Sequence, residues 1–102
     1  MSEIILTDEN FKQEVLETDK TVLVDFWASW CAPCMMLSPV IAEIAQEHTD
    51  IKVGKINVDE QPELSEQYGV SSIPMLLVFR GGEIVNAAVG LRPKEQILEM
   101  LK

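Results

Sequence analysis

Residues 24–34 read Val-Asp-Phe-Trp-Ala-Ser-Trp-Cys-Ala-Pro-Cys, and this stretch decides how the rest of the 102-residue chain is interpreted. Its first half ends a run of β-branched and aromatic residues that begins at Thr21 and is typical of a central strand covered on both faces. Its second half leads into residues 33–46, whose apolar positions recur with helical period. The two cysteines therefore fall where a buried strand gives way to a helix, and Pro33 suits the first helical turn.

Strands and helices alternate on either side of this stretch. In the first half of the chain we expect a strand at 4–6, a helix capped by Thr7 with Phe11, Val15 and Leu16 buried, the strand at 21–27 and the helix at 33–46. In the second half we expect a strand at 51–58 with a possible bulge at Gly54 and a helix at 62–68 closed by Gly69. Strands at 75–79 and 83–89, joined by Gly81-Gly82, and a helix opened by Pro93 follow. The alternation predicts a parallel half of a sheet, and the Gly-Gly hairpin predicts an antiparallel edge. We predict an α/β fold in a single domain, residues 1–102: a three-layer α/β/α sandwich with a mixed central sheet.

Composition and charge narrow the class of function. The chain is 47% hydrophobic and 25% charged, which is ordinary for a globular domain, and its formal net charge is −9. Such a charge repels phosphate backbones and anionic lipid, so we expect no nucleic-acid and no membrane partner. The chain opens without a basic, apolar leader pattern, and we expect a cytoplasmic protein. No long apolar stripe is left unassigned, and we expect a monomer.

The two cysteines, Cys31 and Cys34, are three positions apart. Cross-links that brace small domains close long loops, whereas this pair would close almost none. At a helix N-terminus, unpaired N–H groups and the helix dipole favour a thiolate, so Cys31 is expected to have a lowered pKa and to act as the nucleophile. Cys34 lies one helical turn further on, turned inward, where it would be the resolving thiol.

The pair has three other interpretations, and an argument stands against each. A structural disulfide is unusual in a reducing cytosol. A mononuclear zinc site needs four ligands, and the single histidine, His48, lies at the far end of the helix. An iron–sulfur cluster would need thiolates from two chains. Because Cβ atoms at (i, i+3) on a regular helix are too far apart for a relaxed disulfide, a Cys31–Cys34 bond requires local adjustment, and we expect it to be exposed and exchangeable.

Residues 24–34 resemble the signature of the thioredoxin family, and Ile73-Pro74 and the Gly81-Gly82 hairpin fall where that family has them. The resemblance covers essentially the whole chain and implies the thioredoxin fold and the activity of a protein-disulfide reductase. In that activity Cys31 attacks a substrate disulfide, and Cys34 then displaces the reduced substrate. The resemblance implies no bound cofactor and no metal, protein disulfides as substrates, and thioredoxin reductase, which draws electrons from NADPH, as the partner that restores the dithiol.

The resemblance also assigns a proton acceptor. Asp25 matches the family's buried carboxylate, which takes the proton of Cys34, and burial is expected to raise its pKa. Lys55, on the adjacent predicted strand, matches the partner of that carboxylate. The alternative is that Asp25 and Lys55 form a buried ion pair with a structural role only.

A substrate-binding surface is implied as well. Pro74 resembles the family's cis-proline, with the backbone of Ile73 free to pair with an extended substrate. Trp30 would lie flat against the substrate, and Gly90 would let another backbone approach. The substrate-binding residues expected from the resemblance are Trp30, Ala32, Pro33, Ile73, Pro74 and Gly90.

Three positions depart from the family's usual pattern. Ala32 stands in place of the usual Gly, Met35 in place of a basic residue, and Met75 in place of the usual Thr. Losing a positive charge beside Cys31 weakens thiolate stabilisation, and we expect the two methionines to enlarge a soft apolar surface. Substrate choice is therefore open to change.

Two rival functions stay open at this point. A thiol oxidase or isomerase on the same fold differs mainly in how strongly the reduced form is stabilised. A redox-independent protein-binding module would use the surface around Trp30, Ile73 and Met75 and dispense with the cysteines. Replacing both cysteines by Ser separates the binding module from the reductase, because only the reductase would lose its function.

Overall fold

Two parallel strands, β2 (Val22–Trp27) and β3 (Lys52–Asn57), form the centre of the sheet. In this computed structural model, which describes residues 3–102, the two strands pair in continuous register and Asp25 lies opposite Lys55. β1 (Ile4–Ile5) adds to β3 in parallel, β4 (Met75–Arg80) pairs with β2 in antiparallel, and β5 (Glu83–Val89) forms the far edge. The order β1-β3-β2-β4-β5 confirms the predicted mixed sheet.

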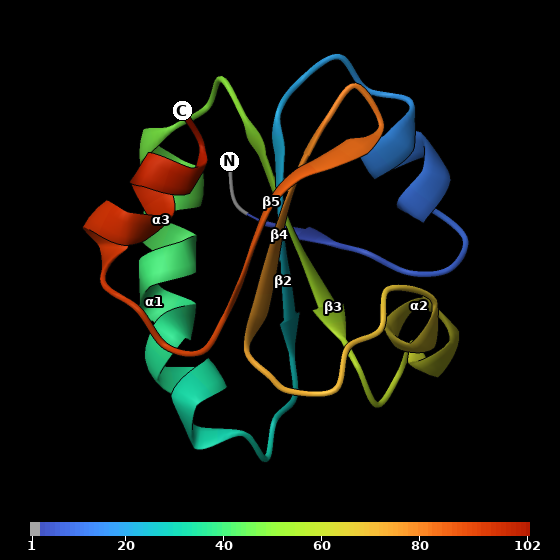
Figure 1. Cartoon of the computed structure of the whole chain (residues 1–102), viewed down its shortest axis with the longest axis vertical. Helices are drawn as coiled ribbons and strands as arrows, with labels where there is room; N and C mark the ends of the chain where they lie inside the picture. The colour runs from blue at the N-terminus through green and yellow to red at the C-terminus, as the bar shows by residue number, and fades with distance from the viewer. Residues whose placement is uncertain (1–2) are drawn as a thin grey trace.

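Helices cover both faces of this sheet (Figure 1). α1 (Ala32–Glu47) and α3 (Lys94–Met100) lie on one side, and α2 (Pro62–Gln67) and the short π-helical η1 (Lys12–Leu16) lie on the other. The three-layer α/β/α sandwich is therefore confirmed. The Gly81-Gly82 hairpin also forms as predicted, with φ angles of 63° and 81° that favour glycine.

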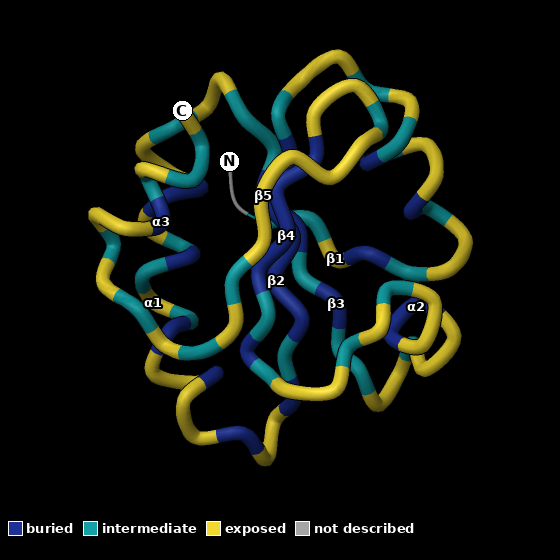
Figure 2. Tube along the Cα trace, in the orientation of Figure 1, coloured by how far each residue is buried: buried dark blue, intermediate teal, exposed yellow. Residues whose placement is uncertain are grey.

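Each face of the sheet has its own apolar core. On the α1 face, Leu23, Leu76 and Val78 pack against residues of α1 and against Ile97 of α3. On the opposite face, Phe26 and Phe79 lie in a cluster that includes residues of η1 and α2. Figure 2 shows the central strands buried, whereas β5 is exposed along most of its length.

The N-terminal helix is capped by Thr7, as predicted, and its regular π-helical part spans Lys12–Leu16. The Thr7 hydroxyl accepts a hydrogen bond from the Asn10 N–H at 3.3 Å, and the Asn10 side chain accepts one from the Thr7 N–H at 2.8 Å. These reciprocal bonds form a capping-box arrangement, and the Phe11 N–H donates to the Thr7 carbonyl at 3.0 Å. Phe11 and Val15 are buried as predicted.

Gly54 does not mark a bulge, because β3 keeps its register with both neighbouring strands through that position. A Cβ atom at Gly54 would overlap the side chain of Leu6. The glycine therefore lets the segment that follows β1 pack directly over the backbone of β3.

Candidate active site

Cys31 is the N-cap residue of α1. Its φ and ψ of −94° and 105° are extended, and its Sγ accepts a hydrogen bond from the backbone N–H of Cys34 at 3.2 Å. Pro33 lies in the first turn, where no backbone donor is required. One backbone donor of the helix N-terminus is therefore directed at the sulfur of Cys31.

Cys31 and Cys34 form a disulfide, with their Cα atoms 5.2 Å apart. The local adjustment that the sequence predicted is the extended conformation of Cys31, which places it just outside the helix. The expectation of an exposed disulfide is wrong: Cys31 is 5% exposed and Cys34 is 2% exposed. Both pack with Ala28, and Trp27 and Ile73 contact this cluster from the side, so only a small part of the Cys31 side chain reaches solvent.

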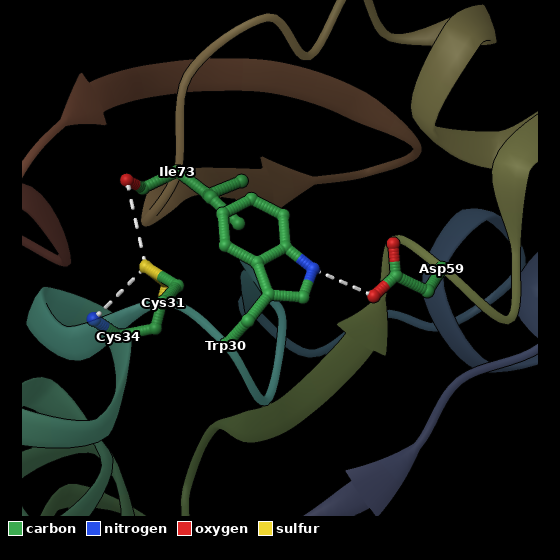
Figure 3. Close-up of a disulfide and its surroundings, with 5 residues drawn as sticks. All are labelled: Trp30, Cys31, Cys34, Asp59 and Ile73. Atoms are coloured by element: carbon green, nitrogen blue, oxygen red, sulfur yellow. Dashed lines mark hydrogen bonds between the residues drawn. A yellow bond between two sulfur atoms is a disulfide. The ribbon is translucent and has the colours of Figure 1, made fainter.

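The segment that precedes β4 also lies close to the disulfide. The Ile73–Pro74 peptide bond is cis, and the carbonyl oxygen of Ile73 lies 3.8 Å from Sγ of Cys31 (Figure 3). Gly90, directly after β5, donates its N–H to the Pro74 carbonyl at 2.8 Å, which brings Gly90 to the same edge. A Cβ atom at Gly90 would meet no other group, but its φ of 101° disfavours any side chain.

Trp30 stands beside the disulfide and is 68% exposed. Its indole N–H donates to the Asp59 carboxylate at 2.8 Å, which holds the ring in place across the end of β3 (Figure 3). Sequence reasoning missed Asp59. The signal was available, because Asp59 follows β3 at the sheet edge where the parallel neighbour β2 also ends.

The rim of the site is apolar along the first turns of α1. Ala32 and Pro33 are exposed, and so are Met35 and Met36, by 48% and 65%. Met75 differs from the expectation: it is half-buried and packs against the core on the other face of the sheet. The methionine that accompanies Met35 at the surface is therefore Met36.

Asp25 is buried on the α1 face of the sheet, with 1% of its surface exposed. Burial raises its pKa from an ordinary 3.8 to about 7, against the opposing effect of the Lys55 ammonium. Lys55 does not form a direct ion pair with it among the described residues. Nζ of Lys55 instead bonds the Ser38 hydroxyl of α1 at 3.2 Å and lies 4.6 Å from the ring centre of Trp27.

The structure thus brings the predicted residues to one end of the sheet in two layers. On the α1 face, Asp25 lies opposite Lys55, and Lys55 lies over the ring of Trp27, which packs against the disulfide. Pro74 is buried, and its carbonyl already accepts from Gly90. The other residues predicted to bind substrate lie at this end of the sheet: Trp30, Ala32, Pro33, Ile73 and Gly90. The arrangement suits transfer of two electrons between the disulfide and a thiol pair on another molecule.

Residues 3–102 contain neither a membrane-spanning helix nor a metal-binding cluster. No helix there has both the length and the apolar character needed to cross a bilayer. No group of three or more His, Cys, Asp or Glu side chains in that range is placed to hold a metal ion.

Comparisons with known proteins agree with this geometry. The profile of the family described as Thioredoxin matches residues 2–102. The chain is 52% identical over 98 residues to Thioredoxin 1 of Nostoc sp., which covers 95% of this chain and 92% of that protein. It is 53% identical over 93 residues to a thioredoxin of Alicyclobacillus acidocaldarius, covering 90% and 88%, and 49% identical over 102 residues to a thioredoxin of Pyropia yezoensis, covering 99% and 95%.

Proposed function

The chain belongs to the thioredoxin family, and on that premise we propose how its residues divide the work of a protein-disulfide reductase. The observation that carries the proposal is the Cys31–Cys34 pair at the N-cap of α1, flanked by the Ile73 carbonyl and the exposed Trp30. The Cys31–Cys34 thiol–disulfide couple itself carries the electrons to the substrate.

The first step uses the reduced protein. The Cys31 thiolate attacks one sulfur of a substrate disulfide, a Cys31–substrate disulfide forms, and the other substrate sulfur leaves as a thiolate. The hydrogen bond from the Cys34 N–H and the N-cap position of Cys31 support the negative sulfur. Of the two sulfurs we assign the attack to Cys31, because Cys34 faces the interior.

The second step releases the product. Cys34 loses its proton to the Asp25 carboxylate, its sulfur bonds to Sγ of Cys31, and the second substrate sulfur leaves as a thiolate. Two electrons have then passed to the substrate, and the protein holds the disulfide seen in this structure. A pKa of about 7 suits Asp25 to this task, because a base works best when its pKa lies near the working pH. Lys55 limits how far burial raises that pKa.

The apolar rim receives the substrate. Trp30, fixed by Asp59, offers a flat apolar surface, and the Ile73 backbone lies close enough to Cys31 to pair with an extended segment that carries the substrate disulfide. Ala32, Pro33, Pro74 and Gly90 leave this approach free of bulky side chains. Met35 and Met36 widen the rim and favour apolar partner segments.

Three further assignments complete the proposal. Thioredoxin reductase, using NADPH, returns the disulfide to the dithiol, so the protein acts in electron transport without a bound cofactor. The cytoplasm is the proposed compartment, because a dithiol that donates electrons needs a reducing environment. The protein acts as a monomer, since one chain supplies every residue of the site.

Trapping the intermediate tests the division of labour. A Cys34→Ser variant mixed with a disulfide-bonded protein should accumulate a mixed disulfide through Cys31, visible as a mass increase that a thiol reductant reverses. The matched Cys31→Ser variant should accumulate far less. Equal trapping by both variants would contradict the assignment of the nucleophile.

A redox titration separates the reductase from its rivals. The Cys31–Cys34 equilibrium is measured in thiol–disulfide buffers of defined poise, by alkylation and mass. A midpoint well below the cytosolic glutathione poise identifies an electron donor, and one well above it identifies an oxidant or isomerase. Partner binding that survives a double Cys→Ser change would indicate the binding module.

A further inference from the structure

A cavity of about 370 Å³ lies on the sheet between the disulfide end and the β1 edge, and the proposed function leaves it unused. Its walls include Glu3, Trp27, Lys55, Asn57 and Glu60. Trp27, Lys55 and Asn57 share the α1 face of their strands with Asp25, because side chains alternate along a strand. The cavity therefore lies against the same face of the sheet as the buried Asp25 carboxyl.

Glu3 differs from the other charged residues of this cavity in its buried carboxyl oxygen. Among residues 3–102 its Oε2 atom is buried and has no hydrogen-bond partner, and the same is true of Oδ1 of Asp25. Such atoms are rare in folded proteins and call for an explanation. Two incompletely satisfied carboxyls thus lie on the same side of the sheet.

The strand register sets Lys55 between them. Lys55 of β3 lies opposite Asp25 of β2 on one side and opposite Ile5 of β1 on the other. Glu3 precedes Ile5 by two residues and lines the cavity together with Lys55. Lys55 therefore has the Asp25 carboxyl opposite it on β2, and on the β1 side it shares a cavity with Glu3.

The charges act on Asp25 in opposite directions. Burial is the main cause of its raised pKa, Lys55 lowers that pKa, and Glu3 raises it. On the same face, Nζ of Lys55 donates to the Ser38 hydroxyl of α1, and the apolar Leu76 of β4 lies opposite Asp25. Glu60 completes the charged groups at the cavity.

We propose that Glu3 is a positioning residue for proton transfer between Cys34 and Asp25: from the cavity that it shares with Lys55, its partly buried carboxylate offsets the Lys55 charge that Asp25 experiences. The proposal rests on the proposed role of Asp25 as the proton acceptor. A negative group near a buried carboxyl makes that carboxyl a stronger base and leaves less of it ionised at a given pH. Glu3 thereby sets the pH range in which Cys34 is activated.

The test is a Glu3→Gln variant, which removes the charge and keeps the shape. The titration midpoint of Asp25 is measured from its carboxyl ¹³C chemical shift in the oxidised protein. The pH profile of disulfide reduction is measured in parallel. We expect the midpoint to move to lower pH by about half a unit, which raises the ionised fraction of Asp25 about threefold at acidic pH. An unchanged midpoint would overturn the proposal.

Two variants serve as controls. Glu60→Gln removes a charge from the same cavity and should leave the Asp25 midpoint nearly unchanged, because Glu60 is not among the groups that shift the pKa of Asp25. Glu3→Asp keeps the charge and should keep the midpoint closer to that of the unmodified protein than Glu3→Gln does. Equal shifts from Glu3→Gln and Glu60→Gln would count against a specific role for Glu3.

Measurements in an Asp25→Asn background distinguish the proposed role of Glu3 from the proposed role of Asp25 as the proton acceptor. If Asp25 is the proton acceptor, Asp25→Asn alters the pH profile of reduction, and adding Glu3→Gln then changes it no further. If Asp25→Asn leaves the profile unchanged, the role of Asp25 fails, whereas the carboxyl titration still shows whether Glu3 acts on it. A profile that responds to Asp25→Asn but not to Glu3→Gln overturns the Glu3 proposal alone.

Discussion

The same two central strands present two faces that are built differently. Away from α1, Val24 and Phe26 of β2 and Ile56 of β3 are fully buried in an apolar layer. Aromatic contacts close this layer, with the rings of Phe79 and Tyr68 edge to face at 5.7 Å. No charged side chain of the described strands is buried there.

Toward α1, each strand changes character along its length. Leu23 and Val53 are buried among apolar residues of α1, but two residues further along the same strands come Asp25 and Lys55. The change occurs toward the end of the strands where Trp27 packs against the disulfide. Burying charged groups costs stability, so this end of the α1 face contributes less to stability than the apolar opposite face does.

The largest effect should come from breaking the apolar face. Phe26→Ala deletes a fully buried ring and should lower the free energy of unfolding by about 3–5 kcal/mol, measured by urea denaturation. Ile84→Ala, on the exposed strand β5, is the control and should change it by less than about 0.5 kcal/mol. Similar losses from both changes would remove the distinction between the buried face and the surface.

At the polar end, in contrast, the buried Asp25 should lower the stability of the protein at neutral and higher pH. Because the pKa of Asp25 rises from 3.8 to about 7 on folding, the native state holds a proton that the unfolded state has lost between those pH values. Stability is therefore full below about pH 4 and decreases as the pH rises through 7. About three pKa units correspond to on the order of 4 kcal/mol, an upper bound for what is lost.

Asp25→Asn should therefore stabilise the oxidised protein at pH 8 by about 2–4 kcal/mol, since the amide carries no charge but still needs partners. The advantage should shrink toward pH 4, where Asp25 is protonated. Urea denaturation at the two pH values measures it. A stabilisation that is the same at both pH values would contradict the electrostatic origin.

A smaller effect tests Lys55 at the same end. Lys55→Gln removes the charge that opposes burial, so the titration midpoint of Asp25 should rise, by up to about one unit. Lys52→Gln is the matched control on the same strand, because Lys52 pairs instead with Glu14 at 2.7 Å. NMR titration of the Asp25 carboxyl gives both midpoints, and a fall after Lys55→Gln would reverse the assigned sign.

The smallest effect is expected outside both faces, on the first turn of α1. Met35 donates its N–H to the Cys31 carbonyl at 3.1 Å, so its side chain lies one turn from the nucleophile. Met35→Lys should increase the rate at which reduced Cys31 is alkylated by about twofold, a modest gain because the position is half exposed. Met36→Lys adds the same charge about 100° further around the helix and should have less effect.

Much of this architecture could be predicted from the sequence, because local patterns carry it. The run ending at Trp27 predicted the central strand, Pro33 predicted the start of α1, and Gly81-Gly82 predicted the hairpin. The cap at Thr7 was predicted as well, because Thr is a common N-cap residue, and its side chain does accept from the Asn10 N–H. The π-helical pattern of Lys12–Leu16 was not predicted, because apolar periodicity indicates a helix without fixing its hydrogen-bond spacing.

The site was only partly predictable, because its outer contacts are long-range. Asp25 and Cys31 lie in one contiguous segment, so their relation could be inferred from a motif. Asp59 reaches Trp30, and Glu3 reaches the cavity beside Lys55, only through the parallel pairing of β3 with β2 and β1. The burial of the disulfide was also missed, because Ile73 packs on it from 42 residues away.

The closeness of the two cysteines has a mechanical consequence. Because the bond spans three positions and joins Cα atoms 5.2 Å apart, it shortens the fully extended chain by only about 5 Å out of roughly 350 Å. When the chain is unfolded by pulling on its ends, the extended length of the oxidised form should be nearly the same as that of the reduced form. A force-extension trace would therefore scarcely distinguish the two redox states by length.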